Sequence, residues 1–361
     1  MSVLLLTAAR TLGTFATPYV LGSPTGYYLL STSLYSSIYS GASGQAAVLA
    51  IVLALVGMLM VVIDLGFVRN VKRFITVGGK GGGGQALKLR AARIPLTVYV
   101  WLVFIVAAIA PLAVMFLSTI TRSPGVFRPD NFTAQFWFGP EGVFGSPLIG
   151  QALLNTLMIA GLAAVVCGVV GMFVGYVVVR LPGTFISGFL RQVSFMPYLI
   201  PGLAFAAAML SLFAVPRGPI PALYGTNWLL VVVMIVAYLP YASRSGISSM
   251  AQIGAEPEEA ARVLGAGYWR RLGSIMLPLQ KSALLTGIVL PFISGMKELS
   301  LVVMLVTPGT ETLTTQSLRF LDQGSPHLAN ATILIVGLVV MFTVLLIQRL
   351  TRINIANGLG G

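Results

Sequence analysis

The chain has 361 residues, of which 57% are hydrophobic and only 9% are charged, and its mean hydropathy is +0.93. A water-soluble domain carries about 25% charged residues, so this composition excludes a soluble globular protein and predicts an integral membrane protein. The net charge is +13, while one cysteine, one histidine and nine acidic residues leave little for a disulfide framework, a zinc site or a hydrolytic carboxylate pair. We therefore expect no metal, no cofactor and no enzymatic activity of the chain itself.

Apolar segments along the chain have the length of roughly 18 to 25 residues that an α-helix needs to cross about 30 Å of hydrocarbon. In chain order, the predicted spans cover residues 46–68, 96–120, 149–179, 188–214, 227–243, 283–306 and 331–348. A weaker candidate covers residues 1–22, where Arg10 interrupts the apolar run. The pattern predicts an all-α polytopic membrane protein with about eight transmembrane helices.

Basic residues determine the predicted orientation, because Lys and Arg accumulate in cytoplasmic loops. Most of the 22 basic residues lie in or beside the loops 69–95, 180–191 and 244–281, or follow the last span. The opposite side holds Arg122, Arg128, Arg217 and Arg319. We therefore expect these loops, and both the start and the end of the chain, on the cytoplasmic side of an inner membrane. Basic loops beside an anionic lipid leaflet account for the net charge without a nucleic-acid partner.

The loop at residues 71–95 contains the run Gly-Gly-Lys-Gly-Gly-Gly-Gly at positions 78–84. A phosphate-binding loop would need a glycine at position 74 and Ser or Thr at position 81, where the chain has Phe74 and Gly81. The segment is instead typical of a flexible basic linker between two membrane domains.

Two stretches of the chain share one order of features: an apolar strip, a Gly/Pro turn, an outer segment rich in Leu, Ser and Thr, and a final span. They align without gaps when Pro24 is placed on Pro308, an offset of 284. Under this interpretation residues 1–70 are the last two spans of a first unit, and residues 96–361 are a complete second unit with six spans. The chain would then start in the middle of a two-unit protein, and the missing half would lie upstream or on another polypeptide.

The third basic loop carries the clearest local pattern. It reads Glu259-Ala260-Ala261, three residues, Gly265, nine residues, Ile275, one residue, and Leu277-Pro278. Acidic residues 256, 258 and 259 favour a helix start after Ala255, because negative charge stabilises the positive end of the helix dipole. Gly265 and Gly267 predict the turn that ends this helix, and a basic segment follows. The alternative is an amphipathic hairpin lying on lipid head groups, which three acidic residues beside an anionic leaflet disfavour.

The spacing of these seven positions resembles the EAA motif of binding-protein-dependent ABC importer permeases. The resemblance covers about residues 96–361, with the end of a preceding unit in 1–70. Further matching segments are Asn155-Thr156, Arg180-Leu181-Pro182-Gly183, Pro197, Pro201-Gly202, Lys297-Glu298-Leu299-Ser300 and Thr307-Pro308-Gly309. Arg180-Leu181-Pro182-Gly183, followed by Pro197 and Pro201-Gly202, resembles the next cytoplasmic turn and broken span of this family. The last two segments, with Leu12-Gly13-Thr14-Phe15, resemble parts of the fused permeases that import ferric iron.

The resemblance implies a type I importer fold and a division of labour among subunits. Two cytoplasmic ATP-binding subunits hydrolyse ATP, and an extracytoplasmic solute-binding protein delivers the substrate. The helix from Glu259 to Gly265 would dock on one ATPase and couple its closure to the spans. Glu259 would pair with a basic residue of the ATPase. Ferric iron is the expected substrate, although thiamine, phosphonates, polyamines and sulfate-like anions use similar permeases.

Ionisable and polar residues within apolar segments are the candidates for the translocation pathway, because they are costly in a membrane and usually face a bundle interior or cavity. Glu298 is either a pathway or gate residue, or it fixes helix packing through a hydrogen bond or an ion pair with Lys297. Asn155 is the second candidate, with interhelical hydrogen bonding as the alternative. The alternative function for the whole chain is an ATP-independent secondary carrier or channel, which would need ion-coupling residues in several spans.

Overall fold

The computed structural model describes residues 11, 13–71, 92–123, 125–126 and 128–351, and within these ranges the chain is helical, with two isolated β-bridges and no strand. The helices in the first part of the chain are α2 (Ala16–Gly22), η1 (Ser23–Thr25), α3 (Leu30–Tyr39), α4 (Ser43–Val71), α5 (Arg93–Phe104), η4 (Ile105–Ile109), α6 (Ala110–Thr119), η5 (Pro129–Asn131), α7 (Gln135–Phe138) and α8 (Pro147–Arg180). They continue with α9 (Phe185–Val193), η6 (Met196–Leu199), α10 (Gly202–Phe213), α11 (Asn227–Gln252), α12 (Glu256–Val263), α13 (Tyr268–Arg271), η7 (Leu272–Met276), α14 (Leu277–Leu279), α15 (Lys281–Met296), α16 (Leu313–Asp322) and α17 (Pro326–Thr351). The all-α membrane fold predicted from the sequence is confirmed.

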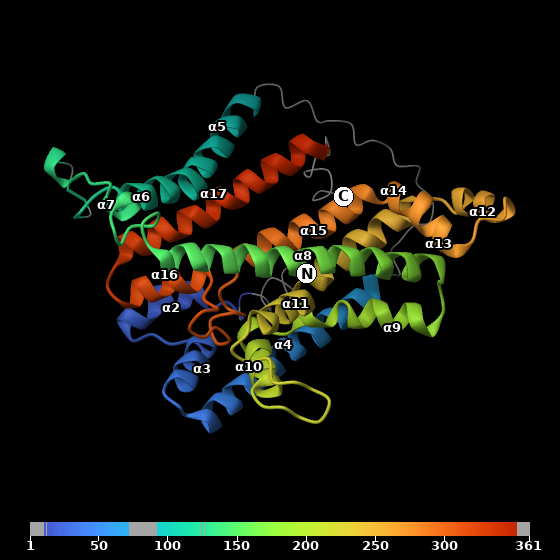
Figure 1. The fold of residues 1–361 in the computed structure, drawn as a ribbon, viewed down its shortest axis with the longest axis horizontal. Coiled ribbons are helices and arrows are strands. Elements are labelled where there is room, and N and C mark those ends of the chain that lie inside the picture. The colour runs from blue at the N-terminus through green and yellow to red at the C-terminus, as the bar shows by residue number, and fades with distance from the viewer. Residues whose placement is uncertain (1–10, 12, 72–91, 124, 127, 352–361) are drawn as a thin grey trace.

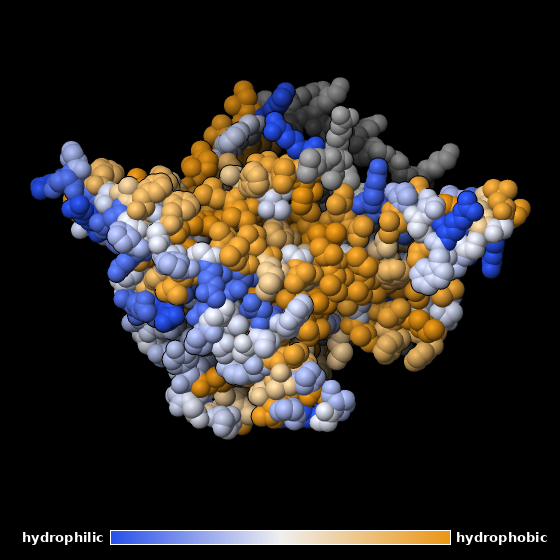
Figure 2. Space-filling model, viewed as in Figure 1, coloured by the Kyte–Doolittle hydropathy of each residue, from blue (hydrophilic) through white to orange (hydrophobic). Residues whose placement is uncertain are grey.

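Long helices run along the longest axis of the molecule, with the α12–α13 hairpin at one end and α7 at the other (Figure 1). In the described residues, four helices are long and apolar enough to cross a membrane, and the number rises to six if each of two bent helix pairs is one span. Apolar side chains gather across the middle of the face shown in Figure 2, and hydrophilic ones lie toward its ends. The count of about eight spans stays a prediction, since the start of the candidate 1–22 and the linker 78–84 lie outside the described residues.

The centre of the bundle consists of α8, α11 and α15, which make the most extensive helix contacts. Small residues allow α8 and α11 to approach closely. A Cβ added at Gly171 would overlap the backbone of Ala242, and one added at Gly175 would overlap the backbone of Gly246. Close backbone approach at small residues is the usual basis of helix packing in membranes, where burial from water adds little.

Two predicted spans are not continuous helices in the structure. The segment predicted as 188–214 contains α9, η6 and α10, and its two halves meet at a bend of 106°, which agrees with the broken span expected at Pro197 and Pro201. The segment predicted as 283–306 is wrong at its end, because α15 stops at Met296 and residues 300–305 form turns. The reason is local: the Glu298 carboxylate accepts a hydrogen bond from the backbone N–H of Leu301 at 3.0 Å and stabilises this turn.

The pairs α3–α4 and α16–α17 share the same local construction. Both short helices have 10 residues, and each is preceded and followed by a left-handed glycine, Gly26 and Gly41 in one pair and Gly309 and Gly324 in the other. Thr32 and Thr315 occupy the same capping position, accepting from the backbone N–H of the residue three earlier at 2.8 and 2.9 Å. These equivalent positions differ by 283 rather than the predicted 284, because Thr25 is an extra residue in the first turn.

Candidate functional site

The predicted helix and turn of the third basic loop are present. Helix α12 starts after Ala255 with its three glutamates in the first turn and Arg262 in the last turn, an arrangement that complements the helix dipole at both ends. Gly265 has φ +78°, a conformation that L residues rarely adopt, and it turns the chain toward α13. The N–H of Ala266 donates to the carbonyl of Ala261 at 2.9 Å and closes the helix end.

The Glu258 carboxylate links the hairpin to the end of the membrane bundle. It lies 3.3 Å from Nε of Arg180, at the end of α8, and 3.6 Å from Nε of Arg271, in α13. The hydroxyl of Tyr176 donates to the same carboxylate at 2.6 Å. The charged side chains of this cluster are only 14–16% exposed, so the attraction is weakly screened. Arg180 also donates to the carbonyl of Gly254 at 2.7 Å, which fixes the start of the hairpin.

The opposite side of the hairpin faces solvent. Glu259 and Ala260 are exposed, whereas Ala261 is buried beneath them. Val263 and Leu264 are 88% and 86% exposed, and Trp269 is 76% exposed. A cluster of exposed apolar side chains on a projecting hairpin is typical of a surface that binds another protein.

The remaining motif residues lie where the hairpin returns to the membrane. Ile275 packs against the buried cluster of Tyr176, Met250, Leu272 and Met276. Leu277 and Pro278 form α14, after which the chain bends by 66° into α15. The structure therefore brings the seven motif positions into one hairpin. Sequence analysis did not identify Glu258 as an anchor, because it placed Arg180 in a cytoplasmic turn and Arg271 in a basic segment and paired neither with a carboxylate.

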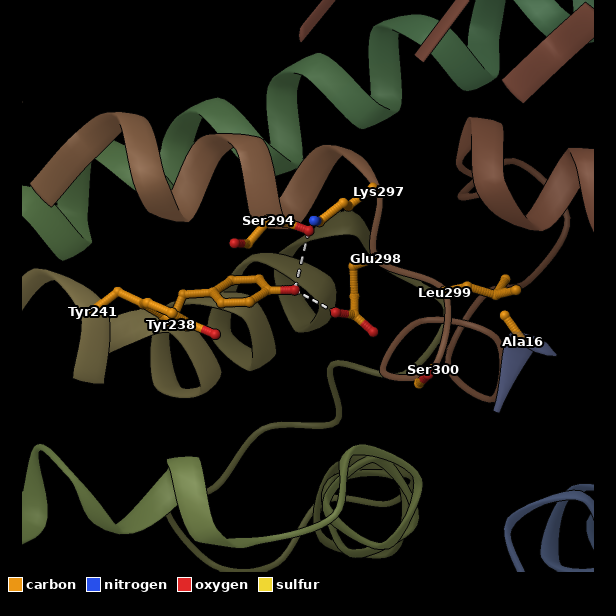
Figure 3. Close-up of a pocket in the computed structure, with 8 residues that line it drawn as sticks. All are labelled: Ala16, Tyr238, Tyr241, Ser294, Lys297, Glu298, Leu299 and Ser300. Atoms are coloured by element: carbon orange, nitrogen blue, oxygen red, sulfur yellow. Dashed lines mark hydrogen bonds between the residues drawn. The ribbon is translucent and has the colours of Figure 1, made fainter. Parts of the chain in front are cut away.

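A cavity of about 310 Å³ lies between α11, the end of α15 and the start of α2. Its lining residues are Ala16, Tyr238, Tyr241, Ser294, Lys297, Glu298, Leu299 and Ser300 (Figure 3). Figure 3 shows the Tyr238 hydroxyl pointing toward Glu298, to which it donates a hydrogen bond. The same hydroxyl lies 3.2 Å from the carbonyl oxygen of Ser294. The cavity is thus polar at the end of α15 and aromatic along α11.

The two ionisable residues of the cavity have different surroundings. The Glu298 carboxylate accepts hydrogen bonds from Tyr238 and from the backbone of Leu301. Within the described ranges no ion pair joins Lys297 to Glu298, so the predicted alternative of a mutual pair is not formed. Lys297 is exposed and terminates α15 as its C-cap residue.

Asn155 lies away from this cavity. Its side-chain amide donates to the carbonyls of Gly309 and Glu311, each at 3.0 Å, and its oxygen accepts from Asn227 at 3.2 Å. The neighbouring Thr156 accepts from the N–H of Leu313 at 2.9 Å. These contacts tie the start of α8 to the turn before α16.

The described residues contain no group of three or more His, Cys, Asp or Glu side chains that could hold a metal ion.

Comparison with known proteins gives a consistent result. The family model described as "Binding-protein-dependent transport system inner membrane component" matches residues 167–355, which is 189 of 361 residues and includes the hairpin. The ferric transport system permease protein FbpB of Actinobacillus pleuropneumoniae is 26% identical over 337 residues, covering 91% of this chain and 47% of that protein. The chain therefore spans about half the length of this relative.

Other relatives carry different substrate names. The putative 2-aminoethylphosphonate transport system permease protein PhnV of Salmonella paratyphi A is 29% identical over 253 residues, covering 69% of this chain and 90% of that protein. Among solved structures, a bacterial ABC transporter involved in the import of the acidic polysaccharide alginate matches with a TM-score of 0.55 and 16% identity, covering 79% of this chain and 98% of that chain. This last similarity supports the fold.

Proposed function

The chain belongs to the binding-protein-dependent transport system inner membrane components, and from this we propose that it is a permease subunit of an ATP-binding-cassette importer. The observation that carries the proposal is the α12–α13 hairpin. It is anchored through Glu258 to the end of α8 and presents exposed Glu259, Val263 and Leu264 at one end of the molecule. Because the exposed surface is anchored to α8, movement of a cytoplasmic partner bound to it would be transmitted to the helix bundle.

The partners are two cytoplasmic ATP-binding subunits and an extracytoplasmic solute-binding protein. The hairpin docks on one ATP-binding subunit, with Glu259 pairing with a basic residue there and Gly265 allowing the turn. The lipid bilayer surrounds the helices, and the basic loops, with both chain ends, lie on the cytoplasmic side of the inner membrane. The chain moves solute but does not hydrolyse ATP itself.

The cavity that contains Glu298 is part of the translocation pathway, and Asn155, away from this cavity, holds the turn before α16 in place. Ferric iron is the proposed substrate, supported by the similarity to the ferric permease over most of the chain. The phosphonate relative makes 2-aminoethylphosphonate the second substrate to test.

Residues 1–70 are the end of a first permease unit, 71–95 a cytoplasmic linker and 96–361 a complete second unit with the coupling loop at 244–281. The matched turns and caps of α3–α4 and α16–α17 support this duplication. A second permease half completes the pathway.

The test of coupling is Gly265→Asp. A Cβ at Gly265 meets nothing within 4 Å, so the variant costs only the strain of a left-handed backbone, about 1 kcal/mol, while placing a charge in the docking surface. We expect normal membrane insertion and loss of ATP-driven uptake of labelled ferric iron in cells carrying the complete transporter.

The matched control is Gly218→Asp, since Gly218 has φ +60° with the same free space but lies in the loop after α10. This control is expected to keep full uptake. Undiminished uptake by Gly265→Asp would remove the coupling assignment and favour the ATP-independent carrier.

A further inference from the structure

The helix pairs α3–α4 and α16–α17 agree in their long-range hydrogen bonds as well as in their turns. The hydroxyl of Ser31, in the first turn of α3, donates to the carbonyl of Thr14 at 2.8 Å. The hydroxyl of Thr314, in the first turn of α16, donates to the carbonyl of Glu298 at 2.6 Å. The donors differ by 283 positions and the acceptors by 284, as the extra Thr25 between them requires. This agreement supports the proposed duplication and allows the surroundings of equivalent residues to be compared.

One face of the second pair is covered by the helix bundle. Leu313 and Ala331 are fully buried and Ile335 is 7% exposed, in a cluster with residues of α8 and α15. The backbone N–H of Leu313 also donates to the hydroxyl of Thr156 in α8 at 2.9 Å. Apolar packing and a hydrogen bond therefore join this face to α8 and α15.

The equivalent face of the first pair is exposed. Leu30, Val48 and Val52 lie 283 positions before the three buried residues and are 38%, 59% and 37% exposed. The N–H of Leu30, which corresponds to that of Leu313, has no hydrogen-bond partner in the part of the chain that the structure describes. The adjacent Leu53 is fully buried in the cluster that includes residues of α10 and α11, so α4 joins this chain through its other face. We call Leu30, Val48 and Val52 the α3–α4 face.

A second copy of this chain does not fit the α3–α4 face. In each copy α16 and α17 already occupy the surface of α8 and α15 that would match it. The ferric permease relative contains further sequence, since its match to this chain covers only 47% of that protein. Helices associate in membranes through van der Waals packing and interhelical hydrogen bonds. These are the two kinds of contact that α16–α17 makes and the α3–α4 face lacks.

We propose that the α3–α4 face is the docking surface for another permease unit, whose helices equivalent to α8 and α15 cover it. Recognition is by apolar packing on Val48 and Val52. An oxygen acceptor at the position equivalent to Thr156 takes the Leu30 N–H. The inference rests on the proposed function and deepens it, because it gives the second permease half a binding surface on this chain.

The first test is photo-cross-linking in intact cells that express the natively encoded chain with benzoylphenylalanine at position 52. We expect an adduct to a peptide whose sequence aligns with α8 or α15 but is identical to neither. Position 58 is the matched control, because Met58 is 57% exposed and its equivalent, Met341, is also exposed, at 54%. This control is expected to give no such adduct. Adducts from position 52 to a second copy of this chain, to an unrelated protein or to lipid alone overturn the proposal.

A second measurement uses the wild-type chain and so does not depend on folding of a variant. A carbene precursor dissolved in the bilayer labels side chains that face lipid, and peptide mass spectrometry locates the label. In native membranes we expect Val48 and Val52 to be labelled several-fold less than Met58. In vesicles that contain this chain alone, the three positions are expected to be labelled to similar extents. Equal labelling of the three positions in native membranes contradicts the proposal, because lipid then covers the α3–α4 face.

These results are independent of the Gly265→Asp experiment, which measures coupling through the hairpin. Loss of uptake there, together with lipid labelling of the α3–α4 face here, leaves the importer assignment in place and removes only the docking surface.

Discussion

Two neighbouring glutamates of α12 have opposite surroundings. Glu258 is surrounded by Arg180, Arg271 and Tyr176, whereas Glu259 is exposed and faces away from the bundle. A carboxylate between two partly buried arginines stabilises the fold, because its removal leaves two positive charges facing each other. An exposed carboxylate contributes little to stability and is available to a partner. Glu258 therefore anchors the hairpin, and under the proposed function Glu259 is the residue that docks on the partner.

Glu258→Gln and Glu259→Gln form a matched pair that tests this division. We expect Glu258→Gln to lower the free energy of unfolding by about 1 to 3 kcal/mol, because the ion pairs with Arg180 and Arg271 are lost while the side chain can still accept the hydrogen bond from Tyr176. Glu259→Gln is expected to leave the unfolding midpoint unchanged and to weaken binding of the ATP-binding subunit. Thermal unfolding and co-purification measure the two effects. Equal destabilisation by both variants would contradict the division.

Residue chemistry was predictable from the sequence only where it is local. The glutamates at the start of α12 and the left-handed Gly265 follow from capping and turn preferences, and both are present. The pairing of Arg180 with Glu258 joins residues 78 positions apart and depends on how α8 ends beside the hairpin. The sequence contains both charges but no pattern that connects them.

At the scale of the helices, the packing of α8 on α11 depends on backbone contact at two glycines of α8, Gly171 and Gly175. Their spacing of four residues puts both on one face of the helix. In the most apolar 18-residue window of each helix, 50% is buried inside the bundle. The other half is free to face lipid or partners. Hydropathy detected both helices, but it does not distinguish their glycine-lined face from their lipid face. The face that matters for packing therefore emerged only from the structure.

Gly175→Ala tests this packing. The added methyl would overlap the backbone of Gly246. The shifts that such overpacking forces on the helices typically lower the free energy of unfolding by about 1 to 3 kcal/mol. We expect a lower thermal unfolding midpoint in detergent. Gly161→Ala on the same helix is the control, because nothing lies within 4 Å of its added Cβ and alanine favours the helix. If both variants have the same unfolding midpoint as the wild type, the packing of α8 on α11 does not depend on this close approach.

Breaks in helices were predictable where proline causes them and not where side chains cause them. The positions of Pro197 and Pro201 predict the bend between α9 and α10. The early end of α15 depends on the Glu298 carboxylate and on Thr314, whose hydroxyl donates to the Glu298 carbonyl at 2.6 Å. Hydropathy alone continued this span through residue 306, since the residues that follow are apolar.

Across the whole molecule, residues 13–71 are joined to the rest of the described chain by buried contacts. Phe15, Leu34 and Leu53 are fully buried in the same cluster as residues of α10 and α11. The Tyr19 hydroxyl donates to Asp322 at 3.2 Å, and burial raises the pKa of the Asp322 carboxyl above its usual range. A segment interpreted from sequence as the end of another unit thus forms part of this core.

These contacts predict that the two parts stay together after the chain is cut between them. A protease site inserted between Gly82 and Gly83 would allow cleavage in the membrane, followed by purification through a tag at the chain end. We expect the fragment containing Phe15 to co-purify, because truncating a fully buried Phe or Leu typically costs about 2 to 5 kcal/mol and such packing is retained in mild detergent. Phe15→Ala combined with Leu34→Ala should release much of this fragment, while Leu21→Ala, at a position 68% exposed, should not. Recovery of the tagged fragment alone from the unsubstituted chain would mean that the buried cluster does not hold the parts together, and that the first 71 residues depend on a separate partner half.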